Sequence, residues 1–113
     1  MTKDTEKAFV IVYSEYLRRR SFGTAKCEAV QFDESKIMAI EGFSKWNPAD
    51  ISYCMRELKK LGYIDRDIIG GVTLNEAGIE FMENKPKEYF SGFTGTVKDL
   101  LTLIAAFLPA SLT

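Results

Sequence analysis

The residues with the clearest potential for recognition chemistry lie between positions 47 and 62. Tyr53, Arg56 and Lys60 recur at spacings of three and four residues, so a helix would carry them on one side. Ala49 precedes them on the same side. Arginine forms paired hydrogen bonds with guanine and lysine contacts phosphate, so this side suits the major groove of double-stranded DNA. A solvated face with ordinary charges, or a face that binds a protein, is the alternative.

Further polar residues extend this candidate DNA-binding surface. Ser52 and Lys59 would flank it, and Arg66 would lie on the strand that follows. Asn47 and Ser52 could donate hydrogen bonds to the DNA backbone. The complete set of predicted DNA-binding residues is Asn47, Ser52, Tyr53, Arg56, Lys59, Lys60 and Arg66.

The charge of the chain restricts such a surface to a local patch. The 113 residues carry a formal net charge of −1. Residues 1–62 hold eleven Lys and Arg against nine Asp and Glu, whereas residues 63–113 hold four against seven. A surface for nucleic acid is therefore expected in the first half. Asp65 and Asp67 flank Arg66, so this arginine is the only cation expected near the following turn.

Catalysis is not expected from this composition. The chain contains no histidine, which removes the commonest general base and the histidine-activated nucleophiles. Cys27 and Cys54 are too far apart for a paired metal site, and we expect both to be reduced and mostly buried. We therefore predict no enzyme activity, no cofactor and no metal. Asp4 and Glu6 interrupt the N-terminus, so no secretory leader is expected and the predicted location is cytoplasmic.

The first 46 residues predict mainly short and medium helices. Residues 5–20 form the first, with either Asp4 or Thr5 as its cap, and Gly23 stops it. Residues 24–32 leave a short helix and a short strand as alternatives, with the helix preferred. Asp33 is expected to cap a further short helix. The inner side of the first helix should comprise Phe9, Val12, Tyr13, Tyr16 and Leu17.

Residues 47–83 predict a helix, a hairpin and a second helix. Asn47 caps the first helix, Pro48 occupies its first turn, and Gly62 ends it. A two-stranded hairpin follows, turning at Gly70 and Gly71, and Asn75 caps the next helix. The residues expected to point inward are Ile51, Cys54, Met55, Leu58 and Leu61 in the first helix, and Ala77, Gly78, Phe81 and Met82 in the second.

Two segments of this unit resemble the winged-helix superfamily. They are residues 56–64, Arg-Glu-Leu-Lys-Lys-Leu-Gly-Tyr-Ile, and residues 72–82, Val-Thr-Leu-Asn-Glu-Ala-Gly-Ile-Glu-Phe-Met. PadR-like and MarR-like regulators share both, and the chain is similar to small bacterial or prophage winged-helix proteins. The resemblance covers residues 5–84. It implies a recognition helix, a β-hairpin wing and a DNA-binding transcriptional regulator.

The end of the chain is unusually apolar. Residues 86–95 contain Pro86, Gly92 and Gly95 and are expected to form a linker, followed by a helix from about Thr96. Its stripe of dimerisation candidates comprises Val97, Leu100, Leu101, Ile104, Phe107 and Leu108. A homodimer interface is preferred, with docking on the first helix and membrane association as alternatives. The apolar run is too short to span a membrane, which requires about 20 residues.

The sequence thus predicts a mainly α-helical fold with a small β-hairpin wing and an apolar C-terminal helix. The winged-helix domain should comprise residues 1–85, the linker 86–95 and the C-terminal segment 96–113. The predicted function is a transcriptional regulator that binds double-stranded DNA as a homodimer. A protein-interaction module without DNA binding is the alternative.

Overall fold

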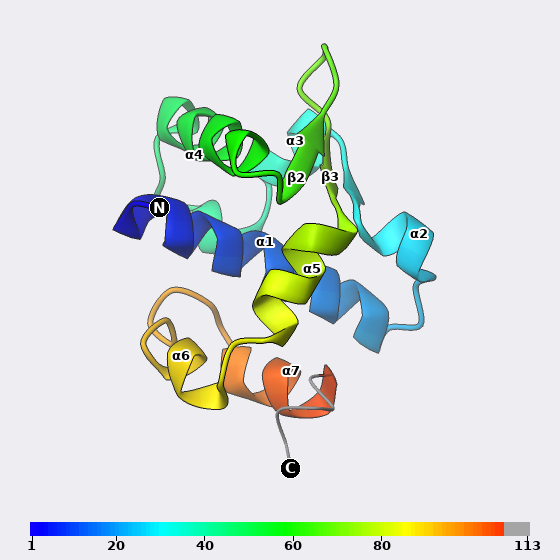
Figure 1. The fold of residues 1–113 in the computed structure, drawn as a ribbon, viewed down its shortest axis with the longest axis vertical. Helices are drawn as coiled ribbons and strands as arrows, with labels where there is room; N and C mark the ends of the chain where they lie inside the picture. Colours follow the sequence, from blue (N-terminus) through cyan, green and yellow to red (C-terminus); the bar gives the residue numbers. More distant parts are fainter. Residues whose placement is uncertain (108–113) are drawn as a thin grey trace.

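The computed structural model describes residues 1–107, which form a mainly helical fold with one three-stranded antiparallel sheet (Figure 1). In chain order the elements are α1 (Lys3–Ser21), α2 (Lys26–Ala29), β1 (Gln31–Phe32), α3 (Glu34–Met38), the 3₁₀ turn η1 (Glu41–Phe43), α4 (Pro48–Lys60), β2 (Ile64–Arg66), β3 (Val72–Leu74), α5 (Glu76–Glu83), α6 (Lys87–Ser91) and α7 (Leu100–Phe107). Strand β3 lies between β1 and β2. The expected combination of many helices with a small hairpin is therefore confirmed.

Helix α1 is the central element of the fold. In Figure 1 it crosses the middle of the molecule, with α4 and the sheet on one side and α6 and α7 on the other. All six residues from Ala8 to Tyr13 have 0% exposure, including Val10 and Ile11, which lie outside the predicted inner stripe. Ile11 contacts η1 so closely that a Cβ on Gly42 would lie 2.9 Å from its Cγ2 atom. Because α1 is buried on all sides, its apolar residues are not confined to one face, and their helical periodicity in the sequence is weak.

The boundaries before α4 differ from expectation in two places. Thr2, rather than Asp4 or Thr5, caps α1, and its Oγ1 accepts a hydrogen bond of 3.2 Å from the Thr5 amide. The segment expected to be either helix or strand contains both, because α2 is immediately followed by β1. The cap of α3 is confirmed: Asp33 Oδ1 accepts a hydrogen bond of 2.8 Å from the Lys36 amide.

Helix α4 has the predicted cap and inner side, with one exception. Asn47 Oδ1 accepts a hydrogen bond of 2.9 Å from the Ala49 amide. Leu61 was expected to point inward, but it is 46% exposed. The reason is that α4 ends at Lys60, after which Gly62 turns the chain with a φ of +85°. The buried residues of the helix are Ile51, Cys54, Met55 and Leu58.

Helix α5 is fixed to the end of α4 through Asn75. This residue caps α5 by accepting a hydrogen bond of 2.9 Å from the Gly78 amide, and its own amide donates one of 2.9 Å to the Gly62 carbonyl. Ala77 is exposed and Ile79 is buried, contrary to the expected inner side. The buried side of α5 is therefore rotated slightly about the helix axis from the side that the sequence predicted.

The C-terminal segment packs against the rest of the chain. The expected linker contains α6, whose Phe90 is fully buried with its ring centroid 6.4 Å from that of Tyr13. Helix α7 begins at Leu100 rather than near Thr96, and it contacts α1.

Part of the apolar stripe predicted to form a dimer interface is covered within one chain. Val97, Leu100 and Ile104 are 5%, 1% and 0% exposed within a single chain, because docking against α1 already covers them. Leu101 is 39% exposed. The side chain of Phe107 and the whole of Leu108 lie outside the described residues.

The two cysteines also differ from each other. Cys54 is buried as expected, and burial raises the pKa of its thiol. Cys27, by contrast, is exposed on the short helix α2.

Candidate nucleic-acid interface

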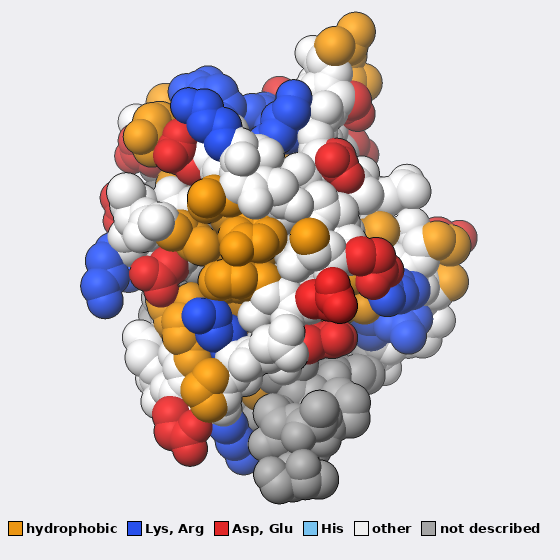
Figure 2. Space-filling view, viewed as in Figure 1, with side chains coloured by type: hydrophobic (Ala, Val, Ile, Leu, Met, Phe, Trp, Pro, Cys, Tyr) orange, Lys and Arg blue, Asp and Glu red, His pale blue; other side chains and the backbone are white. Residues whose placement is uncertain are grey.

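Several of the predicted DNA-binding residues meet in one hollow between α4 and the β2–β3 hairpin. The hollow measures about 720 Å³. Its cations are Arg56, Lys59 and Lys60 of α4 and Arg66 of β2. Figure 2 shows Lys and Arg side chains gathered over α4, beside the apolar tip of the hairpin. The complete lining of this α4–hairpin hollow is Glu34, Arg56, Lys59, Lys60, Arg66, Asp67, Ile68, Ile69 and Gly70.

The helix cations are accessible to a partner. Arg56, Lys59 and Lys60 are all exposed. Lys60 Nζ lies 3.5 Å from Glu57 Oε2, an exposed i,i+3 pair that stabilises the fold little and can exchange for another anion. The Arg56 guanidinium lies 6.0 Å from the ring of Tyr53, which is 50% exposed. An anionic partner would thus meet these side chains with little rearrangement.

Arg66 is held differently from the helix cations. It is partly buried, and its Nε atom is buried with no hydrogen-bond partner among residues 1–107. A buried donor without a partner is costly to the fold. The lining of the hollow includes two carboxylates, Glu34 and Asp67, and four cations, which leaves a local excess of positive charge.

One of these carboxylates is already used in building the hairpin turn. Asp67 Oδ1 accepts hydrogen bonds from the amides of Ile69, at 3.0 Å, and Gly71, at 2.7 Å. Gly70 adopts a φ of +91°, which a residue with a side chain rarely adopts. The turn is therefore specified by its own backbone and side-chain chemistry, and its loop, Asp67–Gly71, has a defined shape.

Three of the predicted residues, Asn47, Ser52 and Tyr53, do not line this hollow. Asn47 is at the opposite end of α4, where its side-chain oxygen serves the cap. Ser52 is partly buried and does not line the hollow.

Sequence reasoning missed Ile68 and Ile69, which line the hollow. The available signal was the occurrence of two adjacent β-branched residues in a turn, where polar residues are usual.

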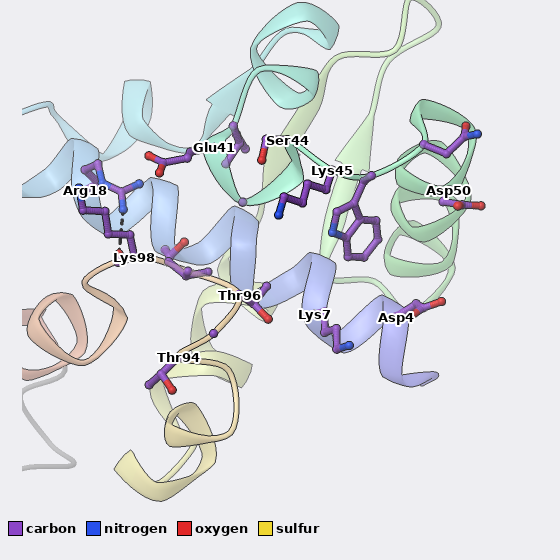
Figure 3. Close-up of a pocket in the computed structure, with 17 residues that line it drawn as sticks. Asp4, Lys7, Arg18, Glu41, Ser44, Lys45, Asp50, Thr94, Thr96 and Lys98 are labelled. Carbon is purple, nitrogen blue, oxygen red and sulfur yellow. Dashed lines mark hydrogen bonds between the residues drawn. The ribbon is translucent and has the colours of Figure 1, made fainter.

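A second hollow, of about 690 Å³, lies along α1 (Figure 3). Its walls are the Ile40–Asp50 region and the segment 94–98. Arg18 donates a hydrogen bond of 3.2 Å to the Lys98 carbonyl, which holds this segment near α1. The charged side chains lining it have both signs: Lys7, Arg18, Lys45 and Lys98 stand with Asp4, Glu41 and Asp50. This hollow lies at the seam between the C-terminal segment and the remaining fold, and its excess of positive charge is smaller than that of the α4–hairpin hollow.

Comparisons with protein families, curated proteins and solved structures found no match for this chain. Within residues 1–107, no cluster of three or more histidine, cysteine or acidic side chains could hold a metal ion. The helices of the described part include none that is long and apolar enough to cross a membrane.

Proposed function

We propose that this chain is a winged-helix DNA-binding module that contacts duplex DNA with α4 and the β2–β3 hairpin. The observation that carries the proposal is the shared position of Arg56, Lys59, Lys60 and Arg66 around one hollow. The order of α4, hairpin and α5 supports it, since the resemblance of residues 56–64 and 72–82 implies this order for a recognition helix and wing.

The outer side of α4 would lie in the major groove. The helix has 13 residues, so it is about 20 Å long and spans several base pairs. Arg56 stands near the middle of the exposed side and is placed to pair with guanine. Lys59 and Lys60 at the end of the helix, with Arg66 on β2, would contact the phosphates that border the groove.

The salt dependence of binding tests this arrangement directly. Binding to a pool of random duplexes is measured by fluorescence anisotropy over a series of salt concentrations. Wild type should bind at low salt and weaken as salt rises, because contacts to phosphate release counterions. The double variant Arg56→Ala/Lys60→Ala should bind more weakly and flatten the salt slope by up to about two units.

A matched control removes the same charge elsewhere. Lys3 and Lys87 are exposed and line neither hollow, so Lys3→Ala/Lys87→Ala should retain the wild-type salt slope. Equal affinity and slope in wild type and Arg56→Ala/Lys60→Ala would reject the interface.

A protein-interaction module gives a different result in these experiments. It should ignore duplex DNA at every salt concentration and co-purify with a protein partner. A transcriptional regulator should in addition enrich one sequence from the random pool, because base contacts in the groove distinguish base pairs. This enrichment separates a regulator from a binder that recognises the backbone alone.

A further inference from the structure

The tip of the β2–β3 hairpin carries two of the three most exposed large apolar residues in the described part of the chain, the third being Phe22 at 82%. Ile68 is 103% exposed and Ile69 is 78% exposed, so neither contributes appreciably to the core. In Figure 1 this tip projects beyond the sheet and the neighbouring helices. Single exposed apolar residues are common on proteins, but two adjacent isoleucines at a projecting tip leave a sizeable apolar surface in water.

The tip has a defined conformation. The Asp67 carboxylate accepts the two amide hydrogen bonds described above, and the Asp67 amide donates a further one of 3.1 Å to the Gly71 carbonyl. At the base of the hairpin, the buried Ile64 and Leu74 pair across β2 and β3. A tip held in this way can press against a partner without first losing much conformational freedom.

The tip is also adjacent to the cations of the proposed DNA interface. Ile68 and Ile69 line the same hollow as Arg56, Lys59 and Lys60. One partner that fills this hollow must therefore offer negative charge to α4 and an apolar surface to the tip. Duplex DNA can offer both at close range, since phosphates border a minor groove about 6 Å wide and the faces of the stacked bases become an apolar surface when one step is partly unstacked.

We propose that Ile68 and Ile69 enter the minor groove as an apolar wedge, partly separate one base step and bend the duplex. This inference rests on the proposed DNA-binding function. Proteins that insert apolar side chains between base steps bend DNA in this way, and the bend brings more of the duplex onto the protein. The cations of α4 would hold the flanking phosphates while the wedge is in place.

An anionic membrane is a less suitable partner for the tip. A bilayer would surround the inserted tip with headgroups on every side. Asp65, Asp67 and Glu34 lie on or beside the hairpin and would meet negative charge in either partner, so the cations of α4 decide between them. A duplex, by contrast, can approach from the α4 side, where the cations are located.

The bend can be measured by energy transfer between dyes at the two ends of a duplex of about 30 base pairs. The duplex contains a central TA step, because such steps kink easily. Wild type should increase the transfer efficiency at saturation. Ile68→Ser/Ile69→Ser should weaken binding by less than about tenfold, because the lost apolar contact is offset by the unstacking that is no longer required. It should leave the transfer efficiency of the bound duplex at the value of free DNA.

The matched control is Ile68→Leu/Ile69→Leu, which keeps the apolar tip and should bend DNA as wild type does. The proposed wedge is contradicted if the serine variant bends DNA as strongly as wild type, or if wild type binds the duplex without bending it. Failure of wild type to bind any duplex would instead remove the proposed function itself. The proposal would also be overturned if wild type sediments with vesicles of anionic phospholipid, the serine variant does not, and wild type fails to bend DNA. That result would assign the tip to a membrane.

Discussion

The Tyr89 hydroxyl donates a hydrogen bond of 3.0 Å to Glu6 Oε2, across 83 residues of sequence. This bond fastens α6 to the beginning of α1. Burial, followed by the hydrogen bond to Glu6, raises the pKa of Tyr89 above its ordinary value. The next residue, Phe90, is fully buried, so the segment expected to be a linker is integrated into the core.

Replacing Tyr89 with phenylalanine should lower the free energy of unfolding by about 1 kcal/mol near neutral pH, because a partly buried hydrogen bond is lost. The pH dependence has a definite sign. Above the ordinary tyrosine pKa of about 10, the unfolded chain loses the proton and the folded chain keeps it, so wild-type stability falls as pH rises. Tyr89→Phe should show a smaller fall. Urea denaturation at about pH 8 and about pH 11 measures both effects.

The control for the comparison of wild type with Tyr89→Phe is the variant Tyr53→Phe. Tyr53 is 50% exposed and its hydroxyl makes no hydrogen bond within residues 1–107, so the loss of that hydroxyl should leave stability near neutral pH unchanged. An identical alkaline decline in wild type and Tyr89→Phe would contradict the role assigned to the bond.

Gly78 should not tolerate even a methyl group. A Cβ at this position would collide with the carbonyl oxygen of Tyr63, which belongs to the backbone and cannot move without disturbing β2. Gly78→Ala should therefore destabilise the fold by about 1–3 kcal/mol, despite the higher helix propensity of alanine. Chemical denaturation followed by circular dichroism provides the measurement. In Gly95→Ala the new methyl group would meet no atom within 4 Å, so that variant should retain wild-type stability.

Docking of α7 predicts unequal effects of two neighbouring substitutions. Ile104→Ala should cost about 2–5 kcal/mol because this side chain is fully buried. Leu101→Ala should cost clearly less, since Leu101 is 39% exposed. For both variants the denaturation midpoint should not depend on protein concentration, because the burial lies within one chain. A wild-type midpoint that rises with concentration would show that a subunit contact contributes to stability instead.

The cap of α3 predicts a feature of acid denaturation. The hydrogen bond from the Ser35 hydroxyl, at 2.7 Å, and that from the Lys36 amide lower the pKa of Asp33. The ionised Asp33 side chain therefore stabilises the folded state at pH values above its unfolded-state pKa. This stabilisation is lost as pH falls through the lower folded-state pKa. Asp33→Asn keeps an oxygen acceptor but cannot titrate, so its stability should vary less with pH in the acid range. Thermal denaturation across that range checks this, and parallel curves for the two proteins would refute it.

Local chemistry in the sequence was sufficient to locate several elements. Asn47, Asn75 and Asp33 were recognised as caps because a side-chain oxygen can satisfy amides only two or three residues away. Gly62 was recognised as a stop because the left-handed backbone after a helix favours glycine. The exposed cations of α4 followed from helical periodicity alone, since their spacing does not depend on distant residues.

Contacts between distant segments required the tertiary structure. The apolar side chains of Val97, Leu100 and Ile104 would suit a subunit interface or the core equally well, and only the position of α1 decided between them. The extension of α1 burial to Val10 and Ile11 likewise depends on helices supplied by both halves of the chain. Hydrophobic patterning shows which side chains avoid water but carries no information about the partner that covers them, because the hydrophobic effect is not directional.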